Sequence, residues 1–195
     1  MKQRAPRNAT LIKVNSVFEA MKSPRNTEFY LALTILLITA VLMAMTYFRW
    51  LPLNFRIGPF RFTHLLTLIG TFLIAILTPM FYILRRRYPQ RNASLTSIHV
   101  FSNLFSFILV SIHFAQQISR AVHPEDNTGL ATFILVFILV VTGFLHKFQV
   151  LEKGRLYPPH RNRYLHVSLT TAFYIIVIIH TLHNFGVLPL IISYV

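Results

Sequence analysis

The sequence predicts an all-α membrane protein, a polytopic bundle of five transmembrane helices. Three observations support this fold class. Of the 195 residues, 54% are hydrophobic, which is high for a soluble domain. Five stretches approach or exceed the ~20 apolar residues that cross a bilayer. The basic residues between these stretches are also distributed very unequally between the two sides of the predicted membrane.

The five predicted spans are long apolar runs, and each is expected to be helical because lipid cannot satisfy open backbone groups. They cover Phe29–Tyr47, Phe62–Leu84, Ile98–Ile118, Leu130–Leu145 and Tyr164–Phe185. Prolines that typically end helices fall between the spans, at Pro52, Pro59, Pro89, Pro124, Pro158 and Pro159. We therefore expect one membrane domain over residues 29–195, after a basic segment over residues 1–28. The apolar tail over residues 186–195 is too short to span alone.

The charge distribution predicts the orientation in the membrane. Nineteen Lys and Arg face only five acidic residues. Fifteen of the 19 lie before the first span, after the second or before the fifth, and four lie on the opposite side. Because cytoplasmic loops collect Lys and Arg, the N-terminus is expected in the cytoplasm and the C-terminus outside, in a cell or plasma membrane. The basic surface then contacts anionic lipid or an acidic partner protein, rather than nucleic acid.

The N-terminal segment is open to two interpretations. Leu11, Val14, Phe18 and Met21 share one helical face, which favours an amphipathic helix on the inner membrane surface. The alternative is a disordered basic tail. The segment has no long apolar core of the kind that a signal peptide requires. The chain also has no cysteine, which excludes disulfides, iron–sulfur ligation and thiol catalysis.

Two pairs of histidines recur with the same spacing inside the predicted spans. His99 and His113 are fourteen residues apart in span three, and His166 and His180 are fourteen apart in span five. Fourteen residues at ~100° each fall ~40° short of four turns, so each pair shares a helix face with ~21 Å between its members. Both spans run from inside to outside, so His99 can meet His166 at one depth and His113 can meet His180 at another.

Two facing imidazoles at one depth are typical of a low-spin haem, because each neutral nitrogen supplies one axial bond to iron. The spacing therefore predicts two haem b groups, with these four histidines as metal ligands. A structural zinc site is disfavoured, since its ligands must converge on one point. Proton relay would require acidic residues, and the predicted spans contain none. The remaining alternative for each histidine is a packing residue that is hydrogen-bonded to a neighbouring helix.

Several further residues are candidates for haem contacts. His64 at the outer start of span two is expected either to hydrogen-bond a propionate or to lie at the interface without a cofactor. Arg161 and Arg163 near the inner level, and Arg120 near the outer level, are candidate propionate partners or contribute only to topology. His183 is a fallback ligand. Gly70 and Gly143 admit the close approach of a porphyrin or of another helix.

The segments "LTSIHVFSNLFSFILVSIHFAQQ" and "RNRYLHVSLTTAFYIIVIIHTLH" resemble the third and fifth helices of the ferric reductase and NADPH oxidase membrane domain. "FILVFILVVTGFL" is similar to the fourth helix of that family. The resemblance covers roughly residues 60–184. It implies that His99 and His166 hold an inner haem, and that His113 and His180 hold an outer one. A complete sixth helix and the flavin and nicotinamide domain of the family are not found, and the chain has no G-x-G-x-x-G segment.

The predicted function is therefore transmembrane electron transfer by a dihaem cytochrome b that is ferric reductase-like but has no dehydrogenase domain. The donor is expected to be a separate cytoplasmic protein or a quinol, and the acceptor lies on the outer side. Two alternatives stay open at this point. One is the haem-bearing anchor subunit of a larger quinol-linked respiratory complex, and the other is a haem-free structural membrane subunit.

The charge distribution generates a test of orientation. Single cysteines introduced at Asn92 and Gly154 are expected to react with an impermeant thiol reagent only from the cytoplasmic side, because both follow or lie within basic loops. Labelling of both positions from outside intact cells would reverse the predicted topology, and with it the direction of electron flow.

Overall fold

The computed structural model describes residues 24–119, 127–149 and 159–184. Its five described helices are α2 (Pro24–Tyr47), α3 (Phe62–Arg87), α4 (Asn92–Ile118), α5 (Asn127–Phe148) and α6 (Pro159–Asn184). All five are long and apolar enough to cross a membrane, which confirms the predicted all-α bundle and indicates an integral membrane protein. The helix suggested for the N-terminal segment and the apolar tail lie outside the described residues.

The helices extend beyond the predicted apolar spans, because polar residues continue a helix after its apolar core ends. Helix α2 begins at Pro24 and therefore includes Glu28, and α5 runs from Asn127 to Phe148. Pro159 precedes the fifth membrane span, as predicted, and is also the first residue of α6. Proline suits this position because the first turn of a helix leaves its N–H groups without intrahelical partners.

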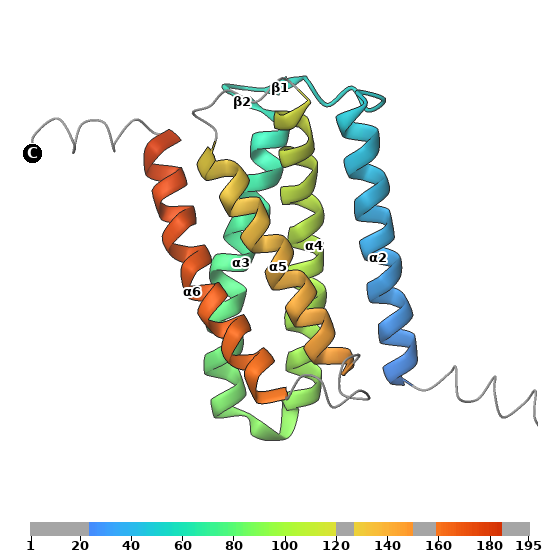
Figure 1. The fold of residues 1–195 in the computed structure, drawn as a ribbon, viewed down its shortest axis with the longest axis vertical. Helices are drawn as coiled ribbons and strands as arrows, with labels where there is room; N and C mark the ends of the chain where they lie inside the picture. The colour runs from blue at the N-terminus through green and yellow to red at the C-terminus, as the bar shows by residue number, and fades with distance from the viewer. Residues whose placement is uncertain (1–23, 120–126, 150–158, 185–195) are drawn as a thin grey trace, which may run out of the picture.

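A short β-hairpin joins α2 to α3, where the sequence predicted only a proline-containing loop. Strand β1 (Arg56–Ile57) pairs antiparallel with β2 (Phe60–Arg61), and Ile57 lies opposite Phe60. Gly58 adopts a φ of 59°, in the left-handed region where glycine has no Cβ to clash. The hairpin lies at the upper end of the bundle in Figure 1, which we call the hairpin end. The opposite end carries Arg85, Arg86, Arg87 and Lys147, and we call it the basic end.

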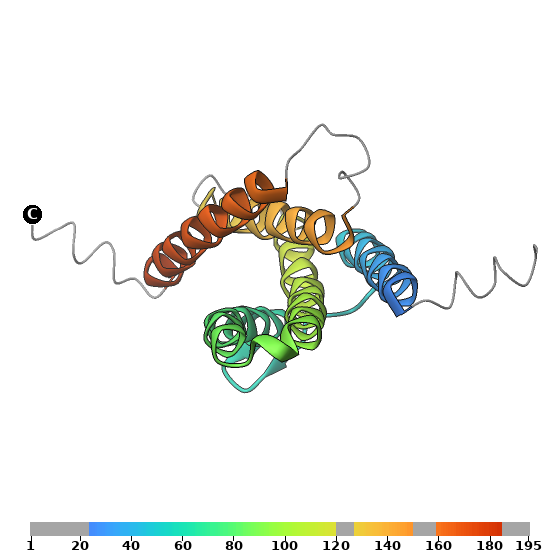
Figure 2. The same ribbon diagram turned by 90° about the horizontal axis from the view of Figure 1, so that it is seen from below.

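Helices α3, α4, α5 and α6 follow one another in a curved row, and α2 packs beside α4 and α5 (Figure 2). Successive helices of the row run in opposite directions, so α4 and α6 both run from the basic end to the hairpin end (Figure 1). Tyr174 of α6 reaches across the row, and its hydroxyl donates to the Ile74 carbonyl of α3 at 3.2 Å. This contact connects the first and last helices of the row.

An apolar layer lies at about mid-length of the four helices in the row. Each of the four helices contributes one buried side chain to this layer. Its members are Ile74, Phe107, Val136 and Phe173. Phe173 is only 2% exposed. In contrast, many large apolar side chains on the helix exteriors are exposed, including Leu37, Phe72 and Ile178. An exposed apolar exterior is compatible with lipid contact, since lipid tails are as apolar as these side chains.

Gly70 allows α3 and α4 to approach closely. A Cβ built at this position would lie 3.0 Å from the Ser106 carbonyl oxygen and 3.1 Å from Cβ of Leu109. Of the two roles considered for this glycine, close helix approach is therefore the one that its surroundings support.

A polar network connects three helices near the basic end. Lys147 of α5 forms a 3.0 Å ion pair with Glu28 of α2. Ser97 of α4 donates to Glu28 at 2.8 Å and accepts from Lys147 at 2.9 Å. Glu28 is the one acidic residue in the described part of the chain, and it lies in the first turns of a membrane-spanning helix. The expectation that the spans lack acidic residues was therefore wrong at this position, because α2 begins earlier than predicted.

The close α3–α4 contact predicts that Gly70→Val destabilises the bundle by about 1–3 kcal/mol, because the added methyl groups must displace helix backbone. Unfolding in detergent, followed by circular dichroism, measures this change. Ala40→Val is the matched control, since Ala40 is exposed on α2 and its enlargement meets no helix partner. Equal stability of the two variants would contradict the packing role of Gly70.

Candidate functional site

Two of the predicted ligands, His99 on α4 and His166 on α6, lie near the basic end of the bundle. Their imidazoles are close enough to interact electrostatically, although 67 residues separate them in sequence. Both side chains are partly buried. The structure therefore places these two histidines near one another at the basic end, where α4 and α6 both begin. His146, at the end of α5, interacts with His166 in the same way.

The ring of His99 is held from two directions. It stacks on Phe81 of α3 with a centroid distance of 4.4 Å and an interplanar angle of 17°. The amide nitrogen of Asn103, one turn further along α4, lies 3.1 Å from Nδ1 and 3.3 Å from Nε2. An amide nitrogen donates to whichever ring nitrogen carries the lone pair, whereas a flipped amide would present its oxygen to an N–H. Asn103 can thus support either tautomer of His99.

The ring of His166 lies against α5. Its Nδ1 is 2.9 Å from Oγ1 of Thr142. A Cβ built at Gly143 would lie 3.3 Å from the Cε1 atom of His166. Gly143 therefore provides room for this imidazole, and a close contact with a histidine ring is what its surroundings support.

At the hairpin end, His113 of α4 has His64 of α3 as a neighbour. The two ring centroids are 5.0 Å apart. His64 is exposed, and its Nε2 is 3.0 Å from Nε2 of Gln117. The structure thus brings the predicted accessory residue His64 to the same level as His113.

His180 of α6 also packs on a glycine of α5. A Cβ at Gly129 would lie 3.4 Å from the Cε1 atom of His180. His183, the fallback ligand, is exposed. Fourteen residues separate Gly129 from Gly143, as they separate His166 from His180. The two α6 histidines therefore meet α5 in the same way at two levels.

Of the three predicted propionate partners, the structure describes the side chain of only one. Arg163 is exposed in the first turns of α6. Arg161 belongs to the same helix, but its side chain lies outside the described part of the structure. Arg120 also falls outside the described residues. The propionate roles of the three arginines stay predictions.

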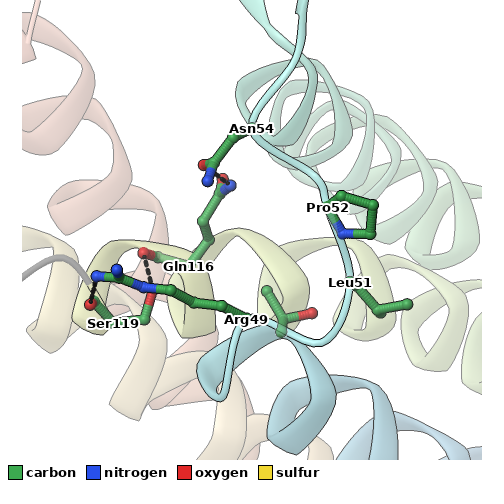
Figure 3. A pocket seen from close by; sticks show the side chains of 7 residues that line it. Arg49, Leu51, Pro52, Asn54, Gln116 and Ser119 are labelled. Atoms are coloured by element: carbon green, nitrogen blue, oxygen red, sulfur yellow. Dashed lines mark hydrogen bonds between the residues drawn. The ribbon is translucent and has the colours of Figure 1, made fainter.

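A polar pocket of about 370 Å³ opens at the hairpin end (Figure 3). The residues that line it are Thr46, Arg49, Leu51, Pro52, Asn54, Gln116 and Ser119. Gln116 donates to Asn54 at 2.7 Å and accepts from Thr63, while the Arg49 guanidinium donates to the Ser119 carbonyl at 2.7 Å. Gln116 is three residues beyond His113 on α4, so the pocket adjoins the hairpin-end histidines.

Sequence reasoning did not find this pocket or the histidine contacts of Thr142 and Gly129. A signal for the α5 contacts was present, since the Thr-Gly dipeptide occurs twice, fourteen residues apart, as do the histidines. The pocket had no comparable signal, because its residues come from α2, α4 and the loop between α2 and α3.

The donor set at the basic end fits an axially ligated haem: one imidazole from each of two parallel helices, with a glycine of a third helix beside one of them. The described residues include no group of three or more His, Cys, Asp or Glu side chains that could hold a metal ion alone. A haem requires only two axial protein ligands. No protein-family model, curated protein or solved structure matches the chain.

The shared level of His99 and His166 can be tested without a cofactor, because the chain has no cysteine of its own. The double variant His99→Cys/His166→Cys is expected to cross-link internally with a short bis-maleimide. His99→Cys/His180→Cys is the matched control, since position 180 is ~21 Å further along the axis of α6. Cross-linking that is as efficient in the control would contradict the two-level arrangement.

Proposed function

We propose that this protein is a dihaem b-type cytochrome that conducts electrons across a membrane. The observation that carries the proposal is the placement of His99 and His166 within electrostatic range near the starts of two parallel helices, combined with the repeat of both histidines fourteen residues further on. Polar side chains inside membrane helices are costly and are functional by default. Four imidazoles in this pattern are more than helix packing requires.

His99 and His166 would hold one haem at the basic end, and His113 and His180 would hold the other at the hairpin end. A haem held by two of these imidazoles would supply one-electron transfer and would bind no substrate at its iron. The chain contributes the ligands and an apolar enclosure. Phe107 and Phe173 lie between the two levels, where the buried layer of the bundle excludes water.

The proposed electron donor is a separate cytoplasmic-side protein or a quinol, and the proposed acceptor is on the outer side. The paired histidines resemble those of the haem domain of ferric reductases and NADPH oxidases. The charge distribution supports a cytoplasmic basic end, and electron flow toward the hairpin end is proposed by analogy with that family.

The pocket beside the hairpin end favours a second candidate, the haem-bearing anchor of a quinol-linked respiratory complex. Asn54, Gln116 and Arg49 offer amide and guanidinium donors of the kind that bind the carbonyl oxygens of a quinone. The two candidates differ in their reductant. Rapid haem reduction by a quinol analogue, lost in Gln116→Leu, would favour the anchor, whereas reduction only by a flavoprotein would favour the first candidate.

The proposed ligand pairs predict the spectra of four single variants. His99→Leu and His166→Leu should each remove the basic-end haem and keep the other, while His113→Leu and His180→Leu should do the reverse. Leucine roughly preserves the volume and adds no buried polar group, so folding should largely survive. Reduced-minus-oxidised spectra and redox titration of the purified variants measure which haem remains. His183→Leu tests the fallback ligand, and because His183 is exposed this variant should keep both haems.

The four spectra should form two matching pairs. If His99→Leu matches His180→Leu, the assignment of levels is wrong. If His180→Leu keeps both haems while His64→Leu loses one, His64 and not His180 is the partner of His113.

A further inference from the structure

We infer that α5 positions the α6 histidines, and that Thr142 fixes the tautomer of His166 so that its Nε2 nitrogen is available to iron. Thr142 is thus assigned as a positioning residue and Gly143 as the residue that makes room for the ring. The inference rests on the proposed haem function, which it deepens by naming what controls one axial ligand.

The direction of the Thr142 hydrogen bond follows from the single hydrogen of its hydroxyl group. Oγ1 donates to the Ile138 carbonyl of its own helix at 2.8 Å, with the Leu139 carbonyl at 3.1 Å. With the hydrogen directed at the Ile138 carbonyl, the oxygen accepts from Nδ1–H of His166 at 2.9 Å. We therefore assign the imidazole proton to Nδ1, which leaves the lone pair of the neutral ring on Nε2.

The hydrogen bond between Thr142 and His166 limits the position of the imidazole because it is buried. Thr142 is only 7% exposed, so water does not readily replace the hydroxyl as a partner. Gly143 follows directly, and a Cβ there would lie 3.3 Å from Cε1 of the same ring. This distance is short enough that a methyl group would push the imidazole away from α5. The hydroxyl and the missing Cβ together define where the ring lies.

A similar contact between a glycine of α5 and a histidine of α6 occurs at the hairpin end. The contacts Gly143–His166 and Gly129–His180 belong to one antiparallel register, since fourteen residues back along α5 correspond to fourteen residues forward along α6. The Cβ distance at Gly129 is 3.4 Å, slightly longer than at Gly143. Thr128 precedes Gly129 in sequence, but its side chain lies outside the described part of the structure. We therefore confine the tautomer assignment to His166.

An acceptor on the Nδ1–H of a ligating histidine orients the ring and increases its strength as a donor to the metal. A stronger axial donor favours the ferric state, because it stabilises the higher positive charge on iron. Loss of the Thr142 oxygen should consequently raise the midpoint potential of the basic-end haem and leave the hairpin-end haem unchanged. Removal of an outer-shell hydrogen-bond partner of this kind typically weakens metal affinity by about 10–100-fold.

The experiment compares Thr142→Val with the intact chain. Valine keeps the branched shape and removes the oxygen, so we expect a positive shift in the potential of one haem, about tenfold or more weaker haem retention and altered low-spin EPR g values. Thr142→Ser restores the hydroxyl and should restore all three. Thr39→Val is the matched control, because Thr39 is also buried and donates to the carbonyl four residues earlier, but on α2. Gly143→Ala should perturb the basic-end haem more than Gly129→Ala perturbs the other.

A cofactor-independent measurement separates this inference from the proposed function. In haem-free, ¹⁵N-histidine-labelled protein, His166 should show the Nδ1–H tautomer in the intact chain and a mixture in Thr142→Val, with His166→Leu assigning the signal. Two haems per chain with no effect of Thr142→Val on potential, EPR or tautomer would overturn the inference alone. A chain that binds no haem but shows the tautomer change would overturn the proposed function and keep the role of Thr142.

Discussion

The structure depends on one apolar layer at the middle of the bundle, where four helices meet in a fixed register. Ile74, Phe107, Val136 and Phe173 form this layer, one from each helix of the curved row. Phe107 and Phe173 lie near the midpoints of the two histidine pairs, and Val136 lies midway between Gly129 and Gly143. Once this layer sets the register, residues seven positions away on either side fall at common levels. The proposed pairing of histidines by depth would thus follow from packing at the centre.

In this arrangement the helices have different roles in the candidate site. Helices α4 and α6 supply the candidate ligands, while α3 and α5 support them with Phe81 and with Thr142 and Gly143. Helix α2 carries none of the predicted ligands and is attached through the Glu28–Lys147–Ser97 network at the basic end. At the hairpin end, its last residues and the following loop form a pocket with α4. The two ends of the bundle therefore differ chemically, which suits the proposed electron path between two different partners.

The sequence was informative about features that follow from a single periodicity along the chain. Uninterrupted apolar runs predicted the five spans, and a spacing of fourteen predicted which histidines share a helix face. It was less informative about contacts that depend on how two helices are aligned with each other. The contact of Thr142 with His166 depends on the antiparallel register of α5 and α6, and the bond from Gln116 to Asn54 depends on the course of a loop. Helix ends were misjudged for another reason. The first span was predicted to begin at Phe29, but α2 already includes Glu28, whose charge is paired with Lys147 of α5.

The proposal that four histidines hold two haems is tested most directly by the haem content and EPR spectrum of the oxidised chain, purified from membranes of haem-replete cells. We expect two haem b per chain, both low-spin, with bis-imidazole g values. A chain without haem, or one whose haem is high-spin with an open coordination position, would contradict it.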